Sequence, residues 1–312
     1  MASMKNGYWL ASADQRFPVS AIRYFTHLYY GFLQVNGVTG EVIIPGELEQ
    51  DMNTFSEQVR HEKKKAMVSI GGPKPNNDAT AIDPSIAISQ MAGNTASRKR
   101  FIETTLALAE NYKFDGVELA WIYPKTKLDM TNLHNLFREW KIAADLHNFP
   151  NGRKLLLSAA VYCYPSIPNA PNEEVRYTGE LDTCIDIFNI IFYNYSPVTS
   201  YHSRFGPIRP SHNYNTQDAL QEWRNVRISL TKLVMGIPLY GGKWIMADDV
   251  NEVTDGAQAV EYKGRVAYRD IPDPETGGTY DDVAWCTSKV ERDANGNPFC
   301  GLDGAMRLKL SQ

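Results

Sequence analysis

Short apolar runs with helical segments between them set the strongest limit on how this chain can fold. The runs are rich in β-branched and aromatic residues, and strands that alternate with helices form parallel sheets. Eight runs have this character: Gly7–Leu10, His27–Leu33, Ala66–Ile70, Gly116–Ala120, Leu155–Val161, Ile187–Tyr193, Leu233–Pro238 and, more weakly, Ala305–Leu308. This alternation predicts an α/β fold, a (β/α)8 barrel of the TIM type.

Two of the intervening helices have marked starts. Asn94-Thr95-Ala96-Ser97 precedes the periodic segment Arg98–Tyr112, and Asp129 and Thr131 offer N-caps for Asn132–Asp145. These helices fit the outer ring of a barrel.

The 312 residues are predicted to form one domain, residues 1–312, because α/β barrels commonly have this length. After the seventh run, Gly, Asp, Pro and short β-like pieces predict a small α+β insertion lobe over residues 241–285. The chain ends four residues after Leu308, so the sequence leaves open whether the eighth βα unit is complete. A gap there would expose strand edges and allow dimerisation, and the oligomeric state stays open.

Charge and hydropathy argue against two kinds of partner. A formal net charge of −4 gives no electrostatic basis for binding nucleic acid or an anionic membrane. No apolar run reaches the roughly 18 to 20 residues of a membrane span. Residues 1–7 contain no apolar signal-peptide core, so either the protein is intracellular or a leader is missing from this chain.

The four cysteines, Cys163, Cys184, Cys286 and Cys300, have neither CxxC nor His-linked spacing, so neither a metal site nor a cofactor is expected. A bridge between Cys286 and Cys300 is conceivable in a secreted protein. The alternative is free, partly buried thiols.

The segment from Phe114 to Pro124 is the most informative motif. It resembles the signature of the family 18 glycoside hydrolases, Asp-Gly-x-Asp-x-Asp-x-Glu, which continues with Tyr-Pro in plant members. Five positions match this pattern: Asp115, Gly116, Trp121, Tyr123 and Pro124. The second aspartate is replaced by Glu118, the third by Ala120 and the catalytic glutamate by Ile122.

The resemblance implies that hydrolysis is lost. In the family, the glutamate protonates the glycosidic oxygen, and the neighbouring aspartate orients the N-acetyl group of the substrate for attack. Ile122 has no proton to donate, and Ala120 cannot hold the acetamido N–H. Loss of the acid alone lowers the rate of such a reaction about 10²–10⁴-fold. Glu118 lies four residues before Ile122. At about 3.3 Å per residue, it is roughly 13 Å deeper in the barrel than the acid position. We therefore interpret Glu118 as a buried, hydrogen-bonded carboxylate and not as a replacement acid.

The resemblance to plant class V chitinases covers most of the chain. Segments that match in order and spacing are Gly7-Tyr8-Trp9, Phe25–Leu28, Ser69–Gly72, Leu155–Val161 and Leu233–Gly241. The sixth strand retains Tyr193, which helps to hold the N-acetyl group in relatives, whereas Asn194 replaces an aspartate. Leu308 stands where relatives place a tryptophan under the central sugar. The family resemblance favours a secreted or vacuolar location.

Three functions follow from this pattern. The favoured one is an inactive, lectin-like protein that binds GlcNAc- or mannose-containing glycans. Its expected contact residues are Trp121, Tyr123, Tyr193, Asn194, Tyr240 and Trp244, although barrel and lobe packing could equally explain the aromatic ones. The alternative is a barrel repurposed for a small molecule or a new reaction in an apolar pocket, with Asp115, Glu118, Tyr193 or Tyr240 as acid/base groups. Residual chitinase activity is the least favoured.

Overall fold

A computed structural model describes residues 4–12, 15–74, 82–167, 175–193, 216–238, 240–246, 259–267, 279–281, 286–292 and 298–303. The chain divides into two compact units. The first comprises residues 1–190 and 226–234, and the second comprises residues 191–225 and 235–312.

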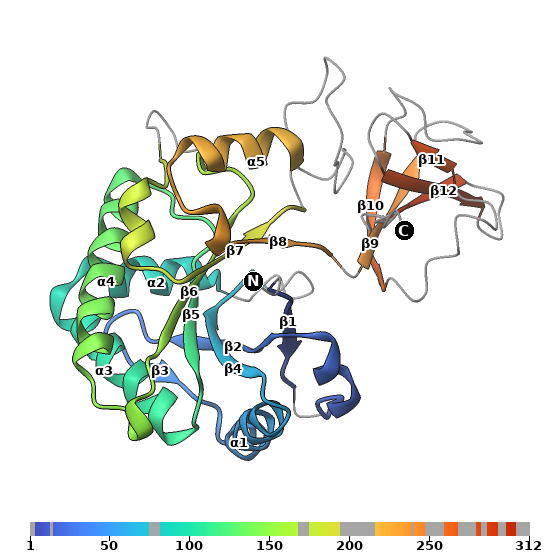
Figure 1. The fold of residues 1–312 in the computed structure, drawn as a ribbon. Helices are drawn as coiled ribbons and strands as arrows, with labels where there is room; N and C mark the ends of the chain where they lie inside the picture. Colours follow the sequence, from blue (N-terminus) through green and yellow to red (C-terminus); the bar gives the residue numbers. More distant parts are fainter. Residues whose placement is uncertain are drawn as a thin grey trace. The chain divides into compact units, whose positions relative to one another are not determined.

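The main sheet has seven strands in one path, ordered β1-β2-β4-β5-β6-β7-β8, with β3 paired to β2 (Figure 1). Their bounds are β1 Asn6–Leu10, β2 His27–Val35, β3 Val42–Ile43, β4 Lys65–Gly71, β5 Gly116–Ala120, β6 Leu156–Tyr162, β7 Ile187–Ile191 and β8 Leu233–Gly236. The pairs from β1 to β6 are parallel, and β3 is antiparallel to β2. The curled parallel sheet and its helices confirm the α/β, TIM-type fold, and the first seven runs are strands. The eighth run, 305–308, lies outside the described residues.

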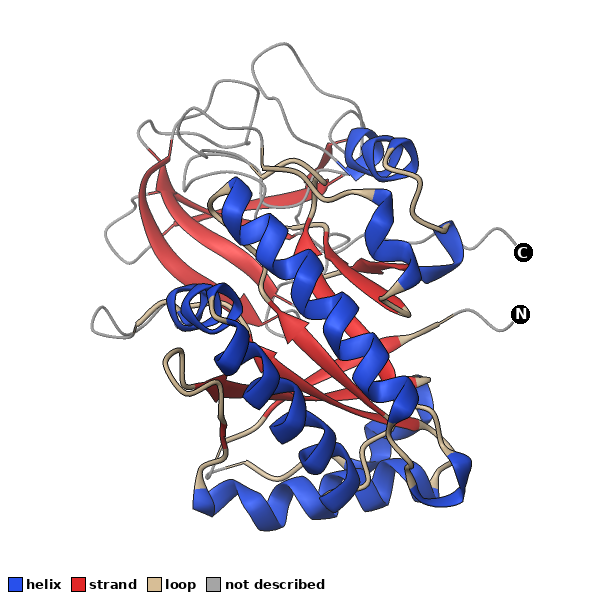
Figure 2. Ribbon diagram, turned by 90° about the vertical axis from the view of Figure 1, so that its left-hand side faces the viewer, coloured by secondary structure: helices blue, strands red, loops and turns tan. Residues whose placement is uncertain are grey.

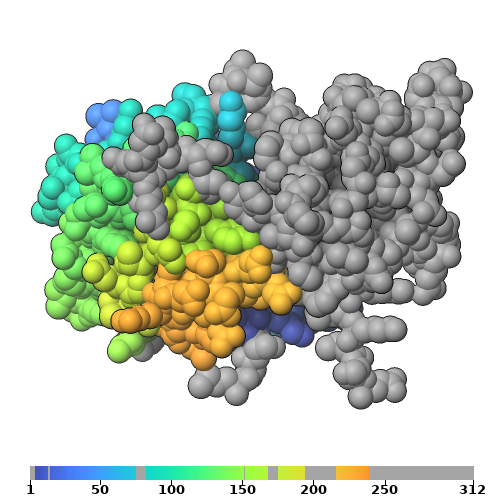
Figure 3. Space-filling view, turned by 90° about the horizontal axis from the view of Figure 1, so that it is seen from above, coloured from blue at the N-terminus to red at the C-terminus, as the bar shows by residue number. Residues whose placement is uncertain are grey.

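Helices lie over one face of this sheet (Figure 2). In the first unit they are α1 Gly46–His61, α2 Pro84–Gly93, α3 Thr95–Asn111 and α4 Lys127–Leu146, and the second unit contains α5 Thr216–Asn225. α1 packs on β4, α2 on β2 and β4, and α3 on β5. α2, α3 and α4 also contact one another, and the cyan to green surface that includes them is continuous in Figure 3.

The helix starts agree only in part with the sequence. Asn94 caps α3 by accepting from the backbone N–H groups of Ala96 and Ser97 at 2.8 and 3.3 Å, as expected for its position. For α4 the predicted caps Asp129 and Thr131 are wrong, because the N-cap is Thr126. Thr126 accepts from the Asp129 N–H at 3.0 Å, and Asp129 accepts in return from the Thr126 N–H at 3.1 Å. This capping box satisfies two free helix N–H groups at once, which neither predicted residue does alone.

The second unit contains an antiparallel sheet ordered β10-β9-β13-β12-β11. Its strands are β9 Tyr240–Met246, β10 Ala259–Ala267, β11 Thr279–Asp281, β12 Cys286–Arg292 and β13 Pro298–Asp303. β10, β11 and most of β9 fall in the range 241–285 expected for an insertion lobe, and β12 and β13 follow it.

The register of this sheet excludes the bridge between Cys286 and Cys300. Cys300 pairs with Val290, and Cys286 pairs with Asp281 on the other side. Four residues along β12 separate Cys286 from Val290, which is about 14 Å at 3.4 Å per residue. Cysteines whose Cα atoms are more than about 7 Å apart cannot be bridged without backbone movement.

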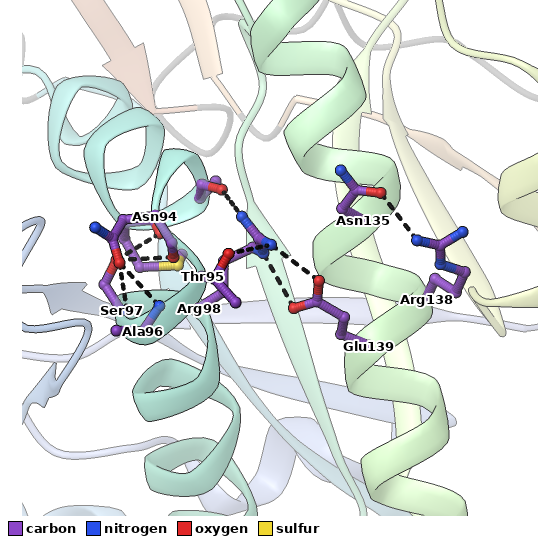
Figure 4. A network of polar contacts seen from close by, with 10 residues as sticks. Asn94, Thr95, Ala96, Ser97, Arg98, Asn135, Arg138 and Glu139 are labelled. Carbon is purple, nitrogen blue, oxygen red and sulfur yellow. Dashed lines mark hydrogen bonds and ion pairs between the residues drawn. The ribbon is translucent and has the colours of Figure 1, made fainter.

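A buried arginine joins three of the outer helices (Figure 4). Arg98, on α3, donates to both carboxylate oxygens of Glu139 on α4, at 3.0 Å each. It also donates to the Ala92 carbonyl at the end of α2 at 2.8 Å and to the Thr95 hydroxyl at 3.3 Å. The Arg98 side chain is 9% exposed, so these acceptors replace the water that the cation loses on folding.

Removing one partner of this pair should destabilise the fold. Glu139→Ala leaves the buried Arg98 cation without its counter-charge, and we expect the free energy of unfolding in urea to fall by about 2 kcal/mol, because Glu139 is itself one-third exposed. The matched control is Glu103→Ala, which removes an exposed glutamate near Lys99 and should change stability by less than about 0.5 kcal/mol. Equal losses in the two variants would contradict this role for Arg98.

Candidate functional site

The motif segment begins at the end of the sheet where the parallel strands start. There the Asp115 carboxylate accepts from the Ala66 N–H at 3.0 Å, and the Asp115 N–H donates to the Ala66 carbonyl at 2.7 Å. Lys65 lies 3.5 Å from the same carboxylate. The hydrogen bonds of Asp115 therefore join β5 to β4. They lie at the end of the sheet opposite the usual active site of a TIM barrel, and residues at that end are expected to contribute to stability.

Glu118 lies at the centre of a hydrogen-bonded network inside the curled sheet. Its carboxylate is fully buried. One oxygen, Oε1, accepts from the Tyr8 hydroxyl at 2.8 Å, the Asn189 amide at 2.7 Å and the Ser158 hydroxyl at 3.2 Å. The other, Oε2, accepts from the Ser69 hydroxyl at 2.5 Å. We call these five residues the carboxylate network; it contains the buried, hydrogen-bonded carboxylate predicted from the sequence.

A second layer of polar groups surrounds the carboxylate network. The Asn6 amide donates to the Asn189 side-chain oxygen at 2.7 Å, and the Tyr29 hydroxyl lies 3.3 Å from the Ser158 hydroxyl. The rings of Tyr8 and Tyr29 are stacked, with centroids 4.8 Å apart. Burial, together with the nearby Glu118 charge, raises the pKa of Tyr29. The core of the barrel is therefore polar at this level and holds its groups in fixed positions.

The sequence did not identify the donors of the carboxylate network. Ser69 pairs with Glu118 in the β4–β5 register, and Ser158 pairs with Glu118 in the β5–β6 register. Side chains at one level of a parallel sheet point the same way, so these hydroxyls and the carboxylate meet. The available signal was a single polar residue inside each apolar run, as at Ser69, Ser158 and Asn189.

The positions that follow Glu118 are apolar and buried. Ala120 is 1% exposed and Ile122 is 5% exposed. Gly71, the last residue of β4, and Gly72, which follows it, have positive φ angles of 104° and 86°, a backbone conformation that glycine adopts without steric cost. The Gly72 N–H donates to the Ala120 carbonyl at 3.0 Å. The turn after β4 therefore lies directly against the end of β5.

Trp121 and Tyr123 have different environments. Trp121 is 1% exposed, and its carbonyl accepts from the Tyr177 hydroxyl at 3.4 Å. Its ring cannot present a face to a sugar in this structure, and its burial fits the alternative of barrel packing. Residue 121 is one position out of step with 118 and 120, so it points to the opposite side of the strand. Tyr123 is 37% exposed, with its ring 5.5 Å from that of Tyr162.

The remaining expected contact residues belong to the second unit. Tyr193 and Tyr240 are brought together, with ring centroids 6.1 Å apart in an edge-to-face arrangement. Asn194 lies outside the described residues, and only the backbone of Trp244, on β9, is described. Within the described part of the chain, no cluster of three or more His, Cys, Asp or Glu could hold a metal ion. None of the described helices is both long and apolar enough to span a bilayer.

Comparison with known proteins places the chain in a family. Residues 5–300 match Glycosyl hydrolases family 18. The chain belongs to this family. A class V chitinase from Arabidopsis thaliana is 30% identical over 283 residues, which cover 86% of this chain and 70% of that protein. A class V chitinase from Lotus japonicus is 29% identical over 90% of this chain and 72% of its own length.

Solved structures of a chitinase-like agglutinin and of a chitinase share the fold. The chitinase-like agglutinin of Robinia pseudoacacia has a TM-score of 0.80 at 26% identity, covering 96% of this chain and 88% of that chain. A Cycas revoluta chitinase in complex with (GlcNAc)3 has a TM-score of 0.82 at 27% identity, with the same coverage. The structures that share this fold therefore include a protein described as a chitinase and one described as a chitinase-like agglutinin.

Burial gives the Glu118 carboxylate a testable pH dependence. Desolvation raises its pKa above the ordinary value of 4.5, against the opposing effect of its hydrogen-bond donors. The folded state therefore holds this proton more tightly than the unfolded chain. The contribution of Glu118 to stability is therefore fully present below about pH 4.5 and is lost as the pH rises through the folded-state pKa.

Glu118→Gln should remove this contribution, because the amide stays neutral and Ser69 can accept where it donated before. We expect the difference in unfolding free energy between the variant and the native chain to increase from pH 4 to pH 8 in favour of the variant. A pH-independent difference would contradict the raised pKa. Glu103→Gln, at an exposed glutamate, should leave the slope unchanged.

Proposed function

We propose that this chain is a chitinase-like protein that binds N-acetylglucosamine-containing glycans without cleaving them. The observation that carries the proposal is Ile122, the residue that stands where the motif resemblance expects the family's general acid. A hydrocarbon side chain cannot protonate a glycosidic oxygen. The adjacent inward position, Ala120, cannot orient the N-acetyl group of a substrate.

Glu118 does not supply the missing acid. Its two oxygens accept four hydrogen bonds from Tyr8, Ser69, Ser158 and Asn189. It is fully buried and lies about 13 Å before the acid position at 3.3 Å per residue. Reaching a sugar would require breaking all four bonds, so the structure supports a structural role.

Several observations favour glycan binding. The chitinase-like agglutinin shares the fold over 96% of this chain, and related chitinases are known in complex with GlcNAc oligomers. Tyr123 presents an exposed ring immediately after the buried motif, and Tyr193 and Tyr240 form an aromatic pair in the second unit. Aromatic faces and phenolic hydroxyls are the groups that sugar-binding sites use.

Calorimetric titration with chitin tetramer tests the binding. Tyr123→Ala should weaken the tetramer about tenfold, because one stacking face is lost. Tyr24→Ala is the matched control, since Tyr24 is 60% exposed but precedes β2 at the opposite end of the sheet, and it should bind as the native chain does. No heat with the tetramer, or equal weakening in both variants, would contradict the proposed site.

The loss of hydrolysis has its own test. Overnight incubation with chitin hexamer, followed by chromatography, should give no fragments. Ile122→Glu alone should remain at least about 10²-fold below a family chitinase, because Ala120 still cannot position the N-acetyl group. The double variant Ala120→Asp/Ile122→Glu should hydrolyse chitin hexamer faster than the single variant does. Full activity in the single variant would show that the site is less altered than we propose.

A second candidate is a small apolar ligand. Ala120, at the end of β5, and Ile122, just after it, have hydrocarbon side chains. An apolar surface favours an apolar ligand over a sugar. A hydrophobic compound that raises the melting temperature when chitin oligomers do not would favour this candidate.

A further inference from the structure

A cluster of exposed aliphatic side chains lies beside Tyr123, at the end of the sheet where the parallel strands finish. We call it the apolar rim, formed by Val38, Ile82, Ile86 and Leu128, which are 82%, 74%, 49% and 68% exposed. These residues lie in the links that follow β2, β4 and β5, or in the first helical turn after them. The apolar rim is therefore at the same end of the barrel as the proposed glycan site.

A contact between α2 and α4 brings two of these residues together. Ser89, on α2, donates to the Asp129 carboxylate, on α4, at 2.5 Å. Ile86 lies three residues before Ser89, so the two side chains are on the same face of α2. Leu128 directly precedes Asp129 on α4. Ile86 and Leu128 are therefore neighbours at the starts of the two helices.

The loop after β2 extends the cluster on the other side of α2. Gly37 lies so close to this helix that a Cβ added to it would be 2.9 Å from the Ala87 carbonyl oxygen and 3.0 Å from the Ala87 Cα. Val38 follows Gly37 in the chain, and Ile86 precedes Ala87. The apolar rim is therefore one surface that runs from α4 over α2 to this loop.

Helix formation does not explain why these positions are apolar. Ile82 immediately precedes Asp83, the N-cap of α2. An apolar residue at that position often packs on the fourth residue of the helix, here Ala87, but Ile82 is left 74% exposed. Ile86 is the third residue of α2, where a capping box has Glu or Gln. Contiguous exposed aliphatic side chains that folding does not bury indicate a binding surface.

The charges around the apolar rim cancel. Residues 36–40, 82–86 and 123–129 contain two lysines and two aspartates, a net charge of zero. Lys125 lies 3.3 Å from Asp83, so the charges between Tyr123 and Ile82 neutralise each other. The four residues of the rim are all aliphatic, whereas protein interfaces are anchored mainly by Tyr, Trp and Arg. This surface suits an uncharged hydrocarbon better than a charged polymer or a protein.

We propose that the apolar rim binds a hydrocarbon chain attached to the glycan, so that the ligand is an amphiphilic oligomer of N-acetylglucosamine. This inference rests on the proposed function, because the sugar part of the ligand contacts Tyr123. Residues 124–127 turn the chain from β5 into α4 and are all that separate Tyr123 from Leu128. One molecule can therefore reach both. An alkyl chain can lie across separate aliphatic side chains, and each methylene that is fully buried strengthens binding about fourfold.

Calorimetric titration of the full chain with three ligands tests the proposal. The ligands are chitin tetramer, the tetramer with an octyl chain at its reducing end, and the tetramer with an octanoyl amide at its non-reducing end. At least one alkylated tetramer should bind the native chain about tenfold more tightly than the plain tetramer does. The double variant Ile86→Ser/Leu128→Ser should lose this gain and keep its affinity for the plain tetramer, because Tyr123 is unchanged.

The matched control is the double variant Ile142→Ser/Leu146→Ser. These two side chains are 56% and 76% exposed at the other end of α4, away from Tyr123. The control should retain the gain from the alkyl chain. Both double variants should keep the native melting temperature, because all four side chains are exposed.

The outcomes separate this inference from the proposed function. Binding of the plain tetramer with no gain from either alkyl chain, or equal loss of the gain in both double variants, would overturn the role of the apolar rim alone. No binding of any of the three ligands would contradict the proposed function itself. Binding to phosphatidylcholine vesicles that Ile86→Ser/Leu128→Ser abolishes, without a gain from the alkylated tetramers, would also overturn the inference and would identify a lipid surface instead.

Discussion

The buried carboxylate of Glu118 is the constraint on which the rest of the first unit depends. Its partners come from four other strands: Tyr8 from β1, Ser69 from β4, Ser158 from β6 and Asn189 from β7. A carboxyl group removed from water is stable only when its acceptors are satisfied, so all four strands must be in register at this level.

Much of the fold could be predicted because its signals are local. Strand runs such as Ala66–Ile70 and the Asn94 cap depend on neighbouring residues in the chain, and both appear in the structure. The cap of α4 was assigned wrongly because Asp129 acts inside the helix, as the reciprocal partner of Thr126. The choice between a bridge and free thiols at Cys286 and Cys300 was left open for a related reason, since loop length says nothing about the register that separates their backbones.

The candidate site was less predictable because it depends on which side of a strand each residue faces and on distant pairing. The interpretation of Glu118 as a buried, hydrogen-bonded carboxylate is confirmed, and the two-residue period of a strand leaves Trp121 on the other side, buried. The donors Ser69 and Ser158 could be found only once the register was known.

The position of Tyr8 has a consequence for how the core opens. β1 is five residues long and, within the described part of the chain, pairs only with β2. Tyr8 is 40% exposed, yet its hydroxyl reaches Glu118 in the centre. Fraying of this short N-terminal strand would withdraw one donor and admit water to the most protected part of the sheet. Opening of β1 therefore controls how fast water reaches Glu118. Hydrogen exchange of the β5 amides should follow the opening of β1 more closely than it follows global unfolding.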